Sequence, residues 1–387
     1  MKTMEVYFDN SATTRVLEPV IDLMVRVMTE DYGNPSAKHI KGMQAEQYIK
    51  EAAEIIAGTL KVAPKEIIFT SGGTESNNMA LIETAVANRR AGTHIISTAI
   101  EHASVYNPLA ALEEQGFTVT YLSVDSKGHI SLDELEAAIT PETILVSIMY
   151  VNNEIGAIEP IEAISKIIKK KNPSILLHVD GIQAYGKLQI RPKRQGIDLL
   201  SVSAHKFHGP KGVGFLYVDE RVKIRPLIYG GGQQRGLRSG TENVPGIAGL
   251  GLAAKLIYED HGAKIKHLRE LKDYMTERLA EVEGTTVNSL TGEESAPQIV
   301  SASFAGTKSE VLLHALEEKG IYVSSGSACS SNHPAVSGTL KGIGVKTELL
   351  DSTLRFSFGI FNTKEEVDYC IDKLQELLPI LRRYQKM

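Results

Sequence analysis

Residues 198 to 206 read Asp198-Leu-Leu-Ser-Val-Ser-Ala-His-Lys206, an apolar run that ends in polar and basic side chains. The run from Asp198 to Val202 is predicted to form a buried strand, which leaves Lys206 where the strand ends and the chain turns. Burial of an ammonium group is costly unless the group is paired or neutralised. A lysine in this position suits a Schiff base with an aldehyde cofactor. Taken alone the segment fits an ordinary surface lysine better, and it is the rest of the sequence that favours the Schiff base.

Other apolar runs on both sides of this segment alternate with segments of helical periodicity, among them residues 161–171. This alternation is typical of a mostly parallel sheet covered by helices, and such sheets bind ligands at the carboxyl ends of their strands. With the strand that precedes Lys206, the runs predict seven strands; the other six are residues 66–70, 93–97, 118–122, 143–151, 175–179 and 214–218.

The pattern changes after Gly246, where a long helical stretch runs to about Gly284 and precedes a smaller α+β unit. Two sequences of capping-box type, Thr307-Lys-Ser-Glu310 and Thr363-Lys-Glu-Glu366, are predicted to begin helices of that unit. We therefore expect two domains: a large domain over residues 15–260, and a small domain made of residues 1–14 and 261–387.

The bulk composition is that of a soluble cytoplasmic protein. The 387 residues are enough for two domains, with a hydrophobic fraction of 42% and a charged fraction of 23%. A net charge of −5 gives no sign of a nucleic-acid partner, and neither a signal-peptide core nor a membrane-spanning apolar run is expected. The two cysteines, Cys329 and Cys370, form no CxxC pair, so we expect no disulfide framework and no metal site.

A glycine-rich turn, Thr70-Ser-Gly-Gly-Thr-Glu-Ser-Asn-Asn78, follows one predicted strand and is predicted to begin a helix. Its glycines allow close approach of the backbone, and the N–H groups of Gly73 and Thr74 are suited to cradle an anion. The segment lacks the GK[ST] of a Walker loop. A plain strand-to-helix turn is the alternative.

Asp180 ends the apolar run that starts at Ser174, where little water can stabilise a carboxylate and a cationic partner is needed. A protonated pyridine nitrogen is one such partner, and the pair would complete the electron sink of pyridoxal phosphate. Gln183, three residues later, is placed to reach the phenolic oxygen of the same cofactor. The alternative for Asp180 is a helix N-cap after a strand.

His102 and Asn153 each follow a predicted strand, so both are expected at the same sheet edge as Lys206. A lone histidine is more often structural, but this shared position favours a role in the site. Arg355, in the predicted strand that starts at Thr353, is suited to bind a substrate carboxylate. A surface arginine is the alternative.

The two cysteines lie in very different sequence. Cys329 belongs to Val323-Ser-Ser-Gly-Ser-Ala-Cys-Ser-Ser-Asn-His-Pro334, which is predicted to be a mobile polar loop. Such a cysteine suits a nucleophile that receives a group at one site and delivers it at another, whereas Cys329 with His333 is weak evidence for a metal. Cys370 falls at helical core spacing and is predicted to be a buried packing residue.

These segments give the chain a resemblance to the cysteine desulfurases of the NifS/IscS type, in the class V aminotransferase group of fold-type I pyridoxal phosphate enzymes. The resemblance runs nearly end to end and implies a large domain with a mostly parallel seven-stranded sheet plus a smaller α+β domain. The matching segments are Tyr7 to Thr14, Gly33 to Ser36, Thr70 to Asn78, Asn152 to Gly156, His178 to Asp180, Ser203 to Lys206, Arg238 to Thr241, Ser325 to Cys329 and Leu354 to Ser357.

The resemblance also implies a role for each candidate residue. Lys206 carries the cofactor, Asp180 pairs with its pyridine nitrogen, and His102 stacks on its ring and handles protons. Cys329 accepts the sulfur. The other implied ligands are Gln183 at the phenolic oxygen, Gly73, Thr74, Ser203 and His205 at the phosphate, Thr241 at the phosphate of the partner subunit in a homodimer, and Asn34, Asn153 and Arg355 at the substrate.

The implied reaction converts L-cysteine and an acceptor thiol into L-alanine and a persulfide on Cys329. The sulfur then passes to acceptor proteins of iron–sulfur cluster assembly or of tRNA and cofactor thiolation. After Cys329 the chain reads Asn332-His-Pro-Ala-Val-Ser-Gly338 where many members of the family have Leu-Glu-Pro-Ser, so the identity of the acceptor stays open. The alternatives are an aminotransferase, a selenocysteine lyase, or a sulfur-relay or scaffold protein without catalysis. Cys329 argues against an aminotransferase, and Lys206 argues against a protein without catalysis.

Overall fold

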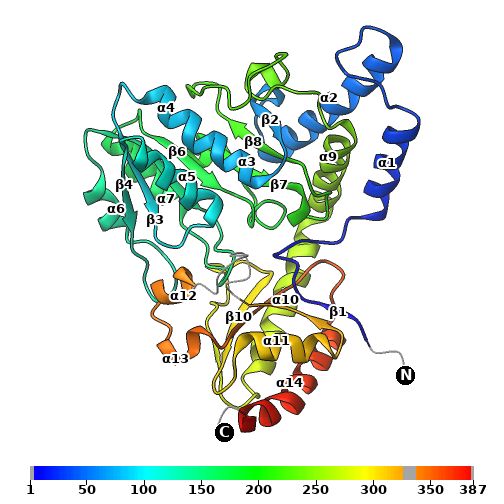
Figure 1. The fold of residues 1–387 in the computed structure, drawn as a ribbon, viewed down its shortest axis with the longest axis vertical. Coiled ribbons are helices and arrows are strands. Elements are labelled where there is room, and N and C mark those ends of the chain that lie inside the picture. The colour runs from blue at the N-terminus through cyan, green and yellow to red at the C-terminus, as the bar shows by residue number, and fades with distance from the viewer. Residues whose placement is uncertain (1–3, 326–336, 385–387) are drawn as a thin grey trace.

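A computed structural model of the chain describes residues 4–325 and 337–384. Within these residues, seven strands form one mixed, mostly parallel sheet, and four further strands form an antiparallel sheet. Figure 1 shows the larger sheet and its helices in the upper part of the molecule and the smaller sheet below, next to both chain termini. The predicted α/β architecture is confirmed.

The larger sheet contains all seven predicted strands, each within two residues of its expected bounds. One strand, β8, runs antiparallel to both of its neighbours, β2 and β7. The five strands β7, β6, β5, β3 and β4 run parallel to one another. Across the sheet the order is β2 (Ile67–Thr70), β8 (Gly214–Val218), β7 (Leu199–Ser203), β6 (Leu176–Asp180), β5 (Thr143–Met149), β3 (His94–Thr98) and β4 (Thr118–Leu122).

Both faces of this sheet are buried, which explains why its strands are continuous apolar runs in the sequence. Ile68, Leu145 and Leu199 pack in a core on one face, and their chain neighbours Phe69 and Val146 pack in a separate core on the other. The helices before, between and after the strands of this sheet are α1 (Glu18–Thr29), α2 (Ile40–Leu60), α3 (Gly73–Asn78), α4 (Thr84–Asn88), α5 (Ala103–Glu114), α6 (Leu132–Ala138), α7 (Ile161–Lys171), α8 (Pro192–Gln195) and α9 (Val244–Tyr258).

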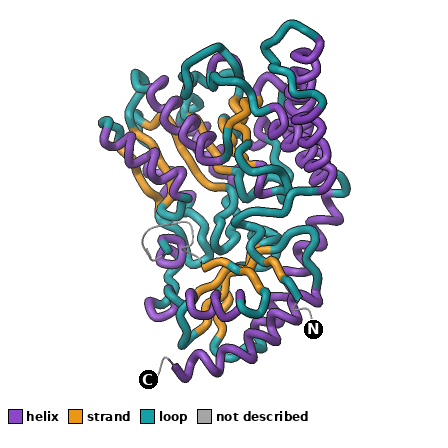
Figure 2. Tube along the Cα trace, turned by 45° about the vertical axis from the view of Figure 1, so that its right-hand side comes forward, coloured by secondary structure: helices purple, strands orange, loops and turns teal. Residues whose placement is uncertain are grey.

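The smaller sheet has the order β12 (Ser324–Ser325), β13 (Thr353–Ser357), β10 (Ile299–Phe304) and β9 (Thr285–Val287). The first strand of the chain, β1 (Val6–Tyr7), pairs in parallel with β11 (Ile321–Tyr322), so the two ends of the chain share this region, as Figure 2 also shows. The helices around it are α10 (His261–Leu279), α11 (Ser309–Glu317), α12 (Gly338–Gly342), α13 (Thr347–Leu350) and α14 (Lys364–Tyr384).

A separate hydrophobic core lies in this region and joins Val6 and Phe8 to Leu268, Phe356 and Cys370. Cys370 is fully buried there, which confirms its predicted packing role. The burial raises the pKa of its thiol well above the ordinary range. The division into domains at residues 14 and 260 stays a prediction, although this core draws on both of the segments predicted to make up the small domain.

Two predictions about helices are wrong. The helical stretch from Gly246 to about Gly284 is not continuous, because α9 ends at Tyr258 and Asp260 adopts a left-handed conformation with φ 48° before α10 begins. The predicted capping box at Thr307 does not form either: Lys308 precedes α11 and no side chain caps that helix. The second predicted box does form, with Thr363 N donating to Glu366 and Glu366 N donating to the Thr363 hydroxyl.

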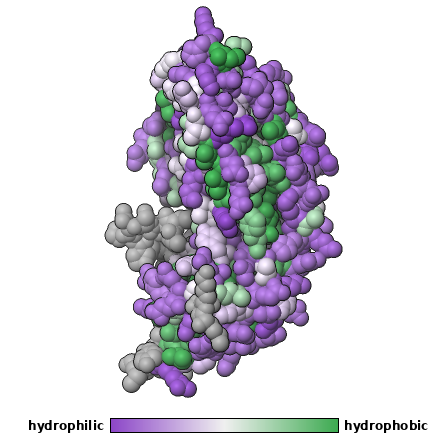
Figure 3. Space-filling view, turned by 90° about the vertical axis from the view of Figure 1, so that its right-hand side faces the viewer, coloured by the Kyte–Doolittle hydropathy of each residue, from purple (hydrophilic) through white to green (hydrophobic). Residues whose placement is uncertain are grey.

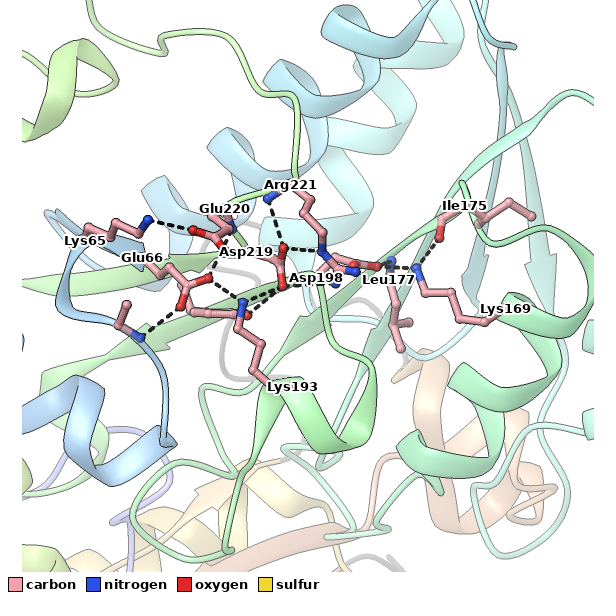
Figure 4. Close-up of polar contacts among 12 residues, drawn as sticks. Lys65, Glu66, Lys169, Ile175, Leu177, Lys193, Asp198, Asp219, Glu220 and Arg221 are labelled. Atoms are coloured by element: carbon pink, nitrogen blue, oxygen red, sulfur yellow. Dashed lines mark hydrogen bonds and ion pairs between the residues drawn. The ribbon is translucent and has the colours of Figure 1, made fainter.

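Charged side chains gather at the amino edge of the larger sheet, where β2 and β7 begin and β8 ends (Figure 4). Lys193 bridges Glu66 at 2.5 Å and Asp219 at 2.8 Å, and both carboxylates are buried. Arg221 adds a second cation to Asp219 at 2.9 Å. These ion pairs lie at the amino edge of the sheet. The predicted site lies at the opposite, carboxyl edge.

None of the helices in the described part of the chain combines the length and the apolar character needed to span a bilayer.

Candidate active site

A cavity of about 240 Å³ lies at the carboxyl edge of the larger sheet. Loops that follow β2, β3, β5, β6 and β7 contribute to its wall, as expected for an open α/β sheet. One lining residue, Arg355, comes instead from β13 of the smaller sheet. The cavity brings together ten of the predicted site residues: Gly73, Thr74, His102, Asn153, Asp180, Gln183, Ser203, His205, Lys206 and Arg355.

Lys206 lies in a single turn of 3₁₀ helix, Ala204–Lys206, directly after β7. Its Nζ donates hydrogen bonds to the carbonyl oxygens of Ser11 at 2.6 Å and Ala12 at 2.8 Å. Two residues later His208 has a left-handed backbone with φ 68°, an unusual conformation for a residue other than glycine. The Ser11 and Ala12 carbonyls of the N-terminal segment thus hold the Lys206 amine, and the chain makes a tight turn immediately after Lys206.

Asp180 ends β6 and is 5% exposed. Its two carboxylate oxygens accept hydrogen bonds from the Asn77 side chain at 2.9 Å and from the Ile182 N–H at 3.0 Å. Burial raises the pKa of Asp180 above its ordinary value, although these two hydrogen bonds act against the rise. A cation bound beside this carboxylate would stabilise its ionised form.

His102 caps the N-terminus of α5, where its Nδ1 accepts the Ser104 N–H at 3.1 Å. The neutral ring therefore carries its proton on Nε2. Ser104 Oγ lies 2.8 Å from the same Nδ1 and accepts a hydrogen bond from Asn77 at 2.9 Å. Because Asn77 also donates to Asp180, a continuous chain of hydrogen bonds joins the histidine to the buried carboxylate.

The glycine turn after β2 packs closely against the loop that follows β6. A Cβ on Gly73 would lie 2.2 Å from Ile182 Cδ1, and the backbone of Gly72 has φ 150°. Gly73, Thr74, Ser203 and His205 line both the central cavity and an adjoining open hollow that also contains Lys211. Burial, followed by the charge of Lys206, lowers the pKa of His205 to about 4, so that its ring is neutral at pH 7.

Arg355 is only 4% exposed and reaches across from the smaller sheet. One terminal nitrogen donates to the carbonyl oxygen of Asn153 and the other to the Asp9 carboxylate, each at 2.9 Å. Its Nε is buried and has no hydrogen-bond partner among the residues that the structure describes. A buried guanidinium with an unused donor is suited to an anion such as a substrate carboxylate.

These features fit pyridoxal phosphate. The lysine supplies an amine for its aldehyde, and Asp180 supplies a buried anion for its pyridine nitrogen. Gly73, which lines the cavity without a side chain, and the neutral His205 suit its phosphate. The fit rests on the chemistry of these donors and on their common place around the cavity.

Two of the predicted residues lie elsewhere. Asn34 is exposed between α1 and α2, where its side-chain oxygen accepts the Ser36 N–H at 2.9 Å, and Thr241 is exposed before α9. The cavity of this one chain includes neither of them, so their roles stay predictions. Cys329, together with His333, lies outside the described residues.

Several residues of the site were not predicted individually. Ser11, Ser104 and Ile182 line the cavity, Asn77 holds Asp180, and Asp9 holds Arg355. The quoted segments Tyr7 to Thr14 and Thr70 to Asn78 include Asp9, Ser11 and Asn77, but nothing in the sequence indicates which atoms they contact. Ser104 follows the predicted His102 by two residues.

A family model described as aminotransferase class-V matches residues 6–370. The chain belongs to this family. Among its relatives, the cysteine desulfurase IscS of Dictyoglomus turgidum is 43% identical over 98% of this chain and 95% of its own length. The cysteine desulfurase IscS of Methanosarcina thermophila is 45% identical over 97% and 93%, respectively. The chain is therefore a class-V member of the cysteine desulfurase type, and it depends on pyridoxal phosphate.

Solved structures of family members support the same conclusion. A NifS-like protein is 42% identical and superposes with a TM-score of 0.93 over 98% of this chain and all (100%) of that one. SspA in complex with cysteine is 35% identical, with a TM-score of 0.81 over 93% of this chain and 100% of its own. The fold-type I architecture of this class-V enzyme is thereby established.

Proposed function

We propose that this cysteine desulfurase binds and converts L-cysteine in the cavity around Lys206, and that Cys329 receives the sulfur. The observation that carries the proposal is the joint placement of Lys206, Asp180 and Arg355 around one cavity of about 240 Å³. A lysine, a buried carboxylate and a buried guanidinium match the amine linkage, the ring cation and the substrate carboxylate that the reaction requires.

We assign the cofactor phosphate to Gly73, Thr74, Ser203 and His205, and the phenolic oxygen to Gln183. The Gln183 side chain donates to the Ser11 carbonyl at 3.0 Å, which fixes its direction. Bound there, pyridoxal phosphate supplies an electron sink that stabilises negative charge at the substrate Cα.

Lys206 and His102 handle protons in this proposal. A Lys206 amine not joined to the cofactor would take the substrate Cα proton, and the Ser11 and Ala12 carbonyls that it contacts would hold the side chain in position. His102, whose neutral ring carries its proton on Nε2, is assigned the role of general acid. Asp180 keeps its negative charge when a cation lies beside it.

The substrate carboxylate is assigned to Arg355 and Asn153, with Asn34 as a further predicted contact. Arg355 is already oriented by Asp9 and by the Asn153 carbonyl, so little conformational freedom is lost when an anion binds. The thiolate of Cys329 attacks the substrate sulfur, the carbon–sulfur bond breaks, and protonation of the carbon leaves L-alanine and a Cys329 persulfide. Atoms balance without an added oxidant or reductant.

We include a homodimer in the proposal, with Thr241 completing the phosphate site of a second copy. Thr241 is exposed here, as a residue that serves a neighbouring site would be. Helix α1 also presents apolar side chains to solvent: Ile21, Val25 and Met28 are 46%, 48% and 53% exposed. Figure 3, which faces the side where α1 and α9 lie, shows hydrophobic side chains gathered on that surface.

Delivery of the sulfur to acceptor proteins of iron–sulfur cluster assembly or of tRNA and cofactor thiolation completes the proposal. A cytoplasmic location belongs to it as well, because a thiol that must be regenerated in each cycle suits a reducing compartment.

Mass spectrometry of the enzyme after incubation with L-cysteine tests this proposal. We expect one added sulfur on the peptide that contains Cys329, and none in the Cys329→Ser variant, since a serine hydroxyl is a far poorer nucleophile toward sulfur than a thiolate. Cys370→Ser is the matched control and should still form the persulfide on Cys329, because the Cys370 thiol is buried in the core around the smaller sheet. A persulfide on Cys370, or normal sulfide release by Cys329→Ser, would contradict the mechanism.

A further inference from the structure

A second lysine is buried directly behind the Lys206 turn. Lys187 is 9% exposed, and its Nζ donates a hydrogen bond to the backbone carbonyl oxygen of Lys206. The side chain comes from the loop that follows β6, four residues after Gln183. No step of the proposed reaction uses this amine.

The surroundings of Lys187 supply no negative charge. It lines a small cavity of about 10 Å³ with neutral polar side chains such as Asn10 and Gln298 and with one other cation besides Lys206, Lys264 of α10. No carboxylate of the described residues lines this cavity. Burial, and after it the charge of Lys206, lowers the pKa of Lys187 to about 7. A buried amine without a counter-charge costs stability, so an apolar residue would serve the fold better.

The contact that Lys187 makes bears on the position of Lys206. The Lys206 turn is also held by Thr14, whose N–H donates to the His205 carbonyl at 2.9 Å and whose hydroxyl accepts the His208 N–H at 2.7 Å. Thr14 thus fixes the residues before and after Lys206, and Lys187 fixes the carbonyl of Lys206 itself. The backbone of Lys206 sets the origin of its side chain, so a looser carbonyl allows the amine to leave its reacting position.

We propose that Lys187 is a positioning residue, whose amine anchors the Lys206 carbonyl and so directs the Lys206 side chain into the active-site cavity. This role rests on the proposed function, in which Lys206 holds the cofactor. Retention of a buried lysine at a cost to stability is expected where the residue serves the site rather than the fold.

Several other titratable groups lie near Lys206 and Lys187. His205 and His208 flank Lys206 in the same turn, and the pKa of each is lowered to about 4, chiefly by burial. Lys211 acts on His205 from the phosphate side, Lys264 approaches Lys187 from α10, and Asp180 faces Lys206 across the cavity. The two histidines are neutral at pH 7 and above, so they offer Lys187 no charge.

Two substitutions separate the hydrogen bond from simple space filling. Lys187→Met keeps an unbranched side chain but removes the donor, and Lys187→Gln keeps an N–H donor without the charge. Lys264→Met is the matched control, because Lys264 lines the same cavity but donates to the carbonyls of Leu256 and Glu259. The measurements on each holoenzyme are the dissociation constant of pyridoxal phosphate, its visible absorbance between about pH 6 and pH 10, and kcat and KM for L-cysteine.

Lys187→Met is expected to hold the cofactor about tenfold more weakly, to change the pH dependence of its absorbance, and to lower kcat more than KM. Lys187→Gln should recover most of the affinity, and Lys264→Met should match the wild type. Replacing an uncompensated buried cation by a similar apolar side chain is expected to leave the fold intact. Wild-type affinity and absorbance in Lys187→Met would overturn the proposal, as would a lowered thermal midpoint as the only effect.

Lys206→Ala distinguishes this outcome from failure of the proposed function. If Lys206→Ala keeps the wild-type absorbance of bound pyridoxal phosphate, the assignment of Lys206 itself is wrong. If that absorbance is lost in Lys206→Ala but unchanged in Lys187→Met, only the positioning role of Lys187 is refuted.

Discussion

The two edges of the larger sheet hold buried carboxylates in opposite ways. At the carboxyl edge, Asp180 is 5% exposed and accepts hydrogen bonds from the neutral Asn77 side chain and the Ile182 N–H. At the amino edge, Asp219 is 1% exposed and accepts from the cations of Lys193 and Arg221. The pKa of Asp180 is raised, and the pKa of Asp219 is lowered.

The opposite shifts have two causes: Asp219 accepts from cations and lies closer to the surface, whereas Asp180 lies deeper and accepts from neutral donors. The carboxylates at the amino edge are neutralised by cations of the protein itself, and these ion pairs stabilise the fold. The carboxyl edge is built from neutral donors around Asp180 and from an arginine with an unused N–H, so it is arranged to receive a ligand that carries both a cation and an anion.

The largest effect is expected at Arg355, where the carboxyl edge already contains an ion pair with Asp9 at 2.9 Å. If Asp9 orients Arg355 for the substrate, Asp9→Asn should raise KM for L-cysteine roughly ten- to a hundredfold and change kcat less, as expected for loss of a charged hydrogen bond. Steady-state kinetics measures both constants. A lower KM in the variant would mean that Asp9 competes with the substrate carboxylate.

The amino edge predicts a smaller effect, on stability rather than on activity. Asp219→Asn should lower the free energy of unfolding by about 2 kcal/mol near pH 7, less than for a fully buried pair because Lys193 and Arg221 are partly exposed. The folded-state pKa of Asp219 is depressed, so its contribution is present above the unfolded-state pKa of about 4 and is lost as the pH falls through the folded-state value. Urea unfolding at pH 7 and at about pH 3 measures the difference.

Two outcomes test that reading of the amino edge. The stability gap between wild type and Asp219→Asn should narrow toward low pH, and kcat should stay unchanged. Glu220→Gln is the matched control, because Glu220 pairs with Lys65 at the exposed surface of the same network. A gap that is equal at both pH values, or a loss of turnover in Asp219→Asn, would show that the two edges are not functionally separate.

Much of the fold was predictable because the larger sheet is buried on both faces, so that each strand is an apolar run with polar residues at its ends. The same reason made the carboxyl-edge candidates visible: Asp180 and Lys206 stand where such runs stop. The direction of β8 was not visible, since an apolar run reads the same in either direction. The break at Asp260 was missed because a left-handed backbone at a residue other than glycine leaves no clear signal in the sequence.

The parts of the site that sequence reasoning missed depend on contacts between distant segments. Asp9 meets Arg355 across 346 residues, and Asn77 meets Asp180 across 103. Lys187 reads in the sequence as an ordinary lysine after a turn, and only the packing of α10 and the Lys206 turn around it makes it a buried amine. Thr307 failed as a helix cap because α11 begins one residue later than predicted, with Lys308 at the N-cap position.

The central claim is that Lys206 is the residue to which the cofactor is joined. Reduction of the holoenzyme with borohydride, followed by digestion and mass spectrometry, fixes the cofactor to the lysine that holds it. The pyridoxyl group is expected on Lys206, and Lys206→Ala should yield no labelled peptide and no turnover. A label on Lys187 or on Lys211, with Lys206 unmodified, would contradict the account.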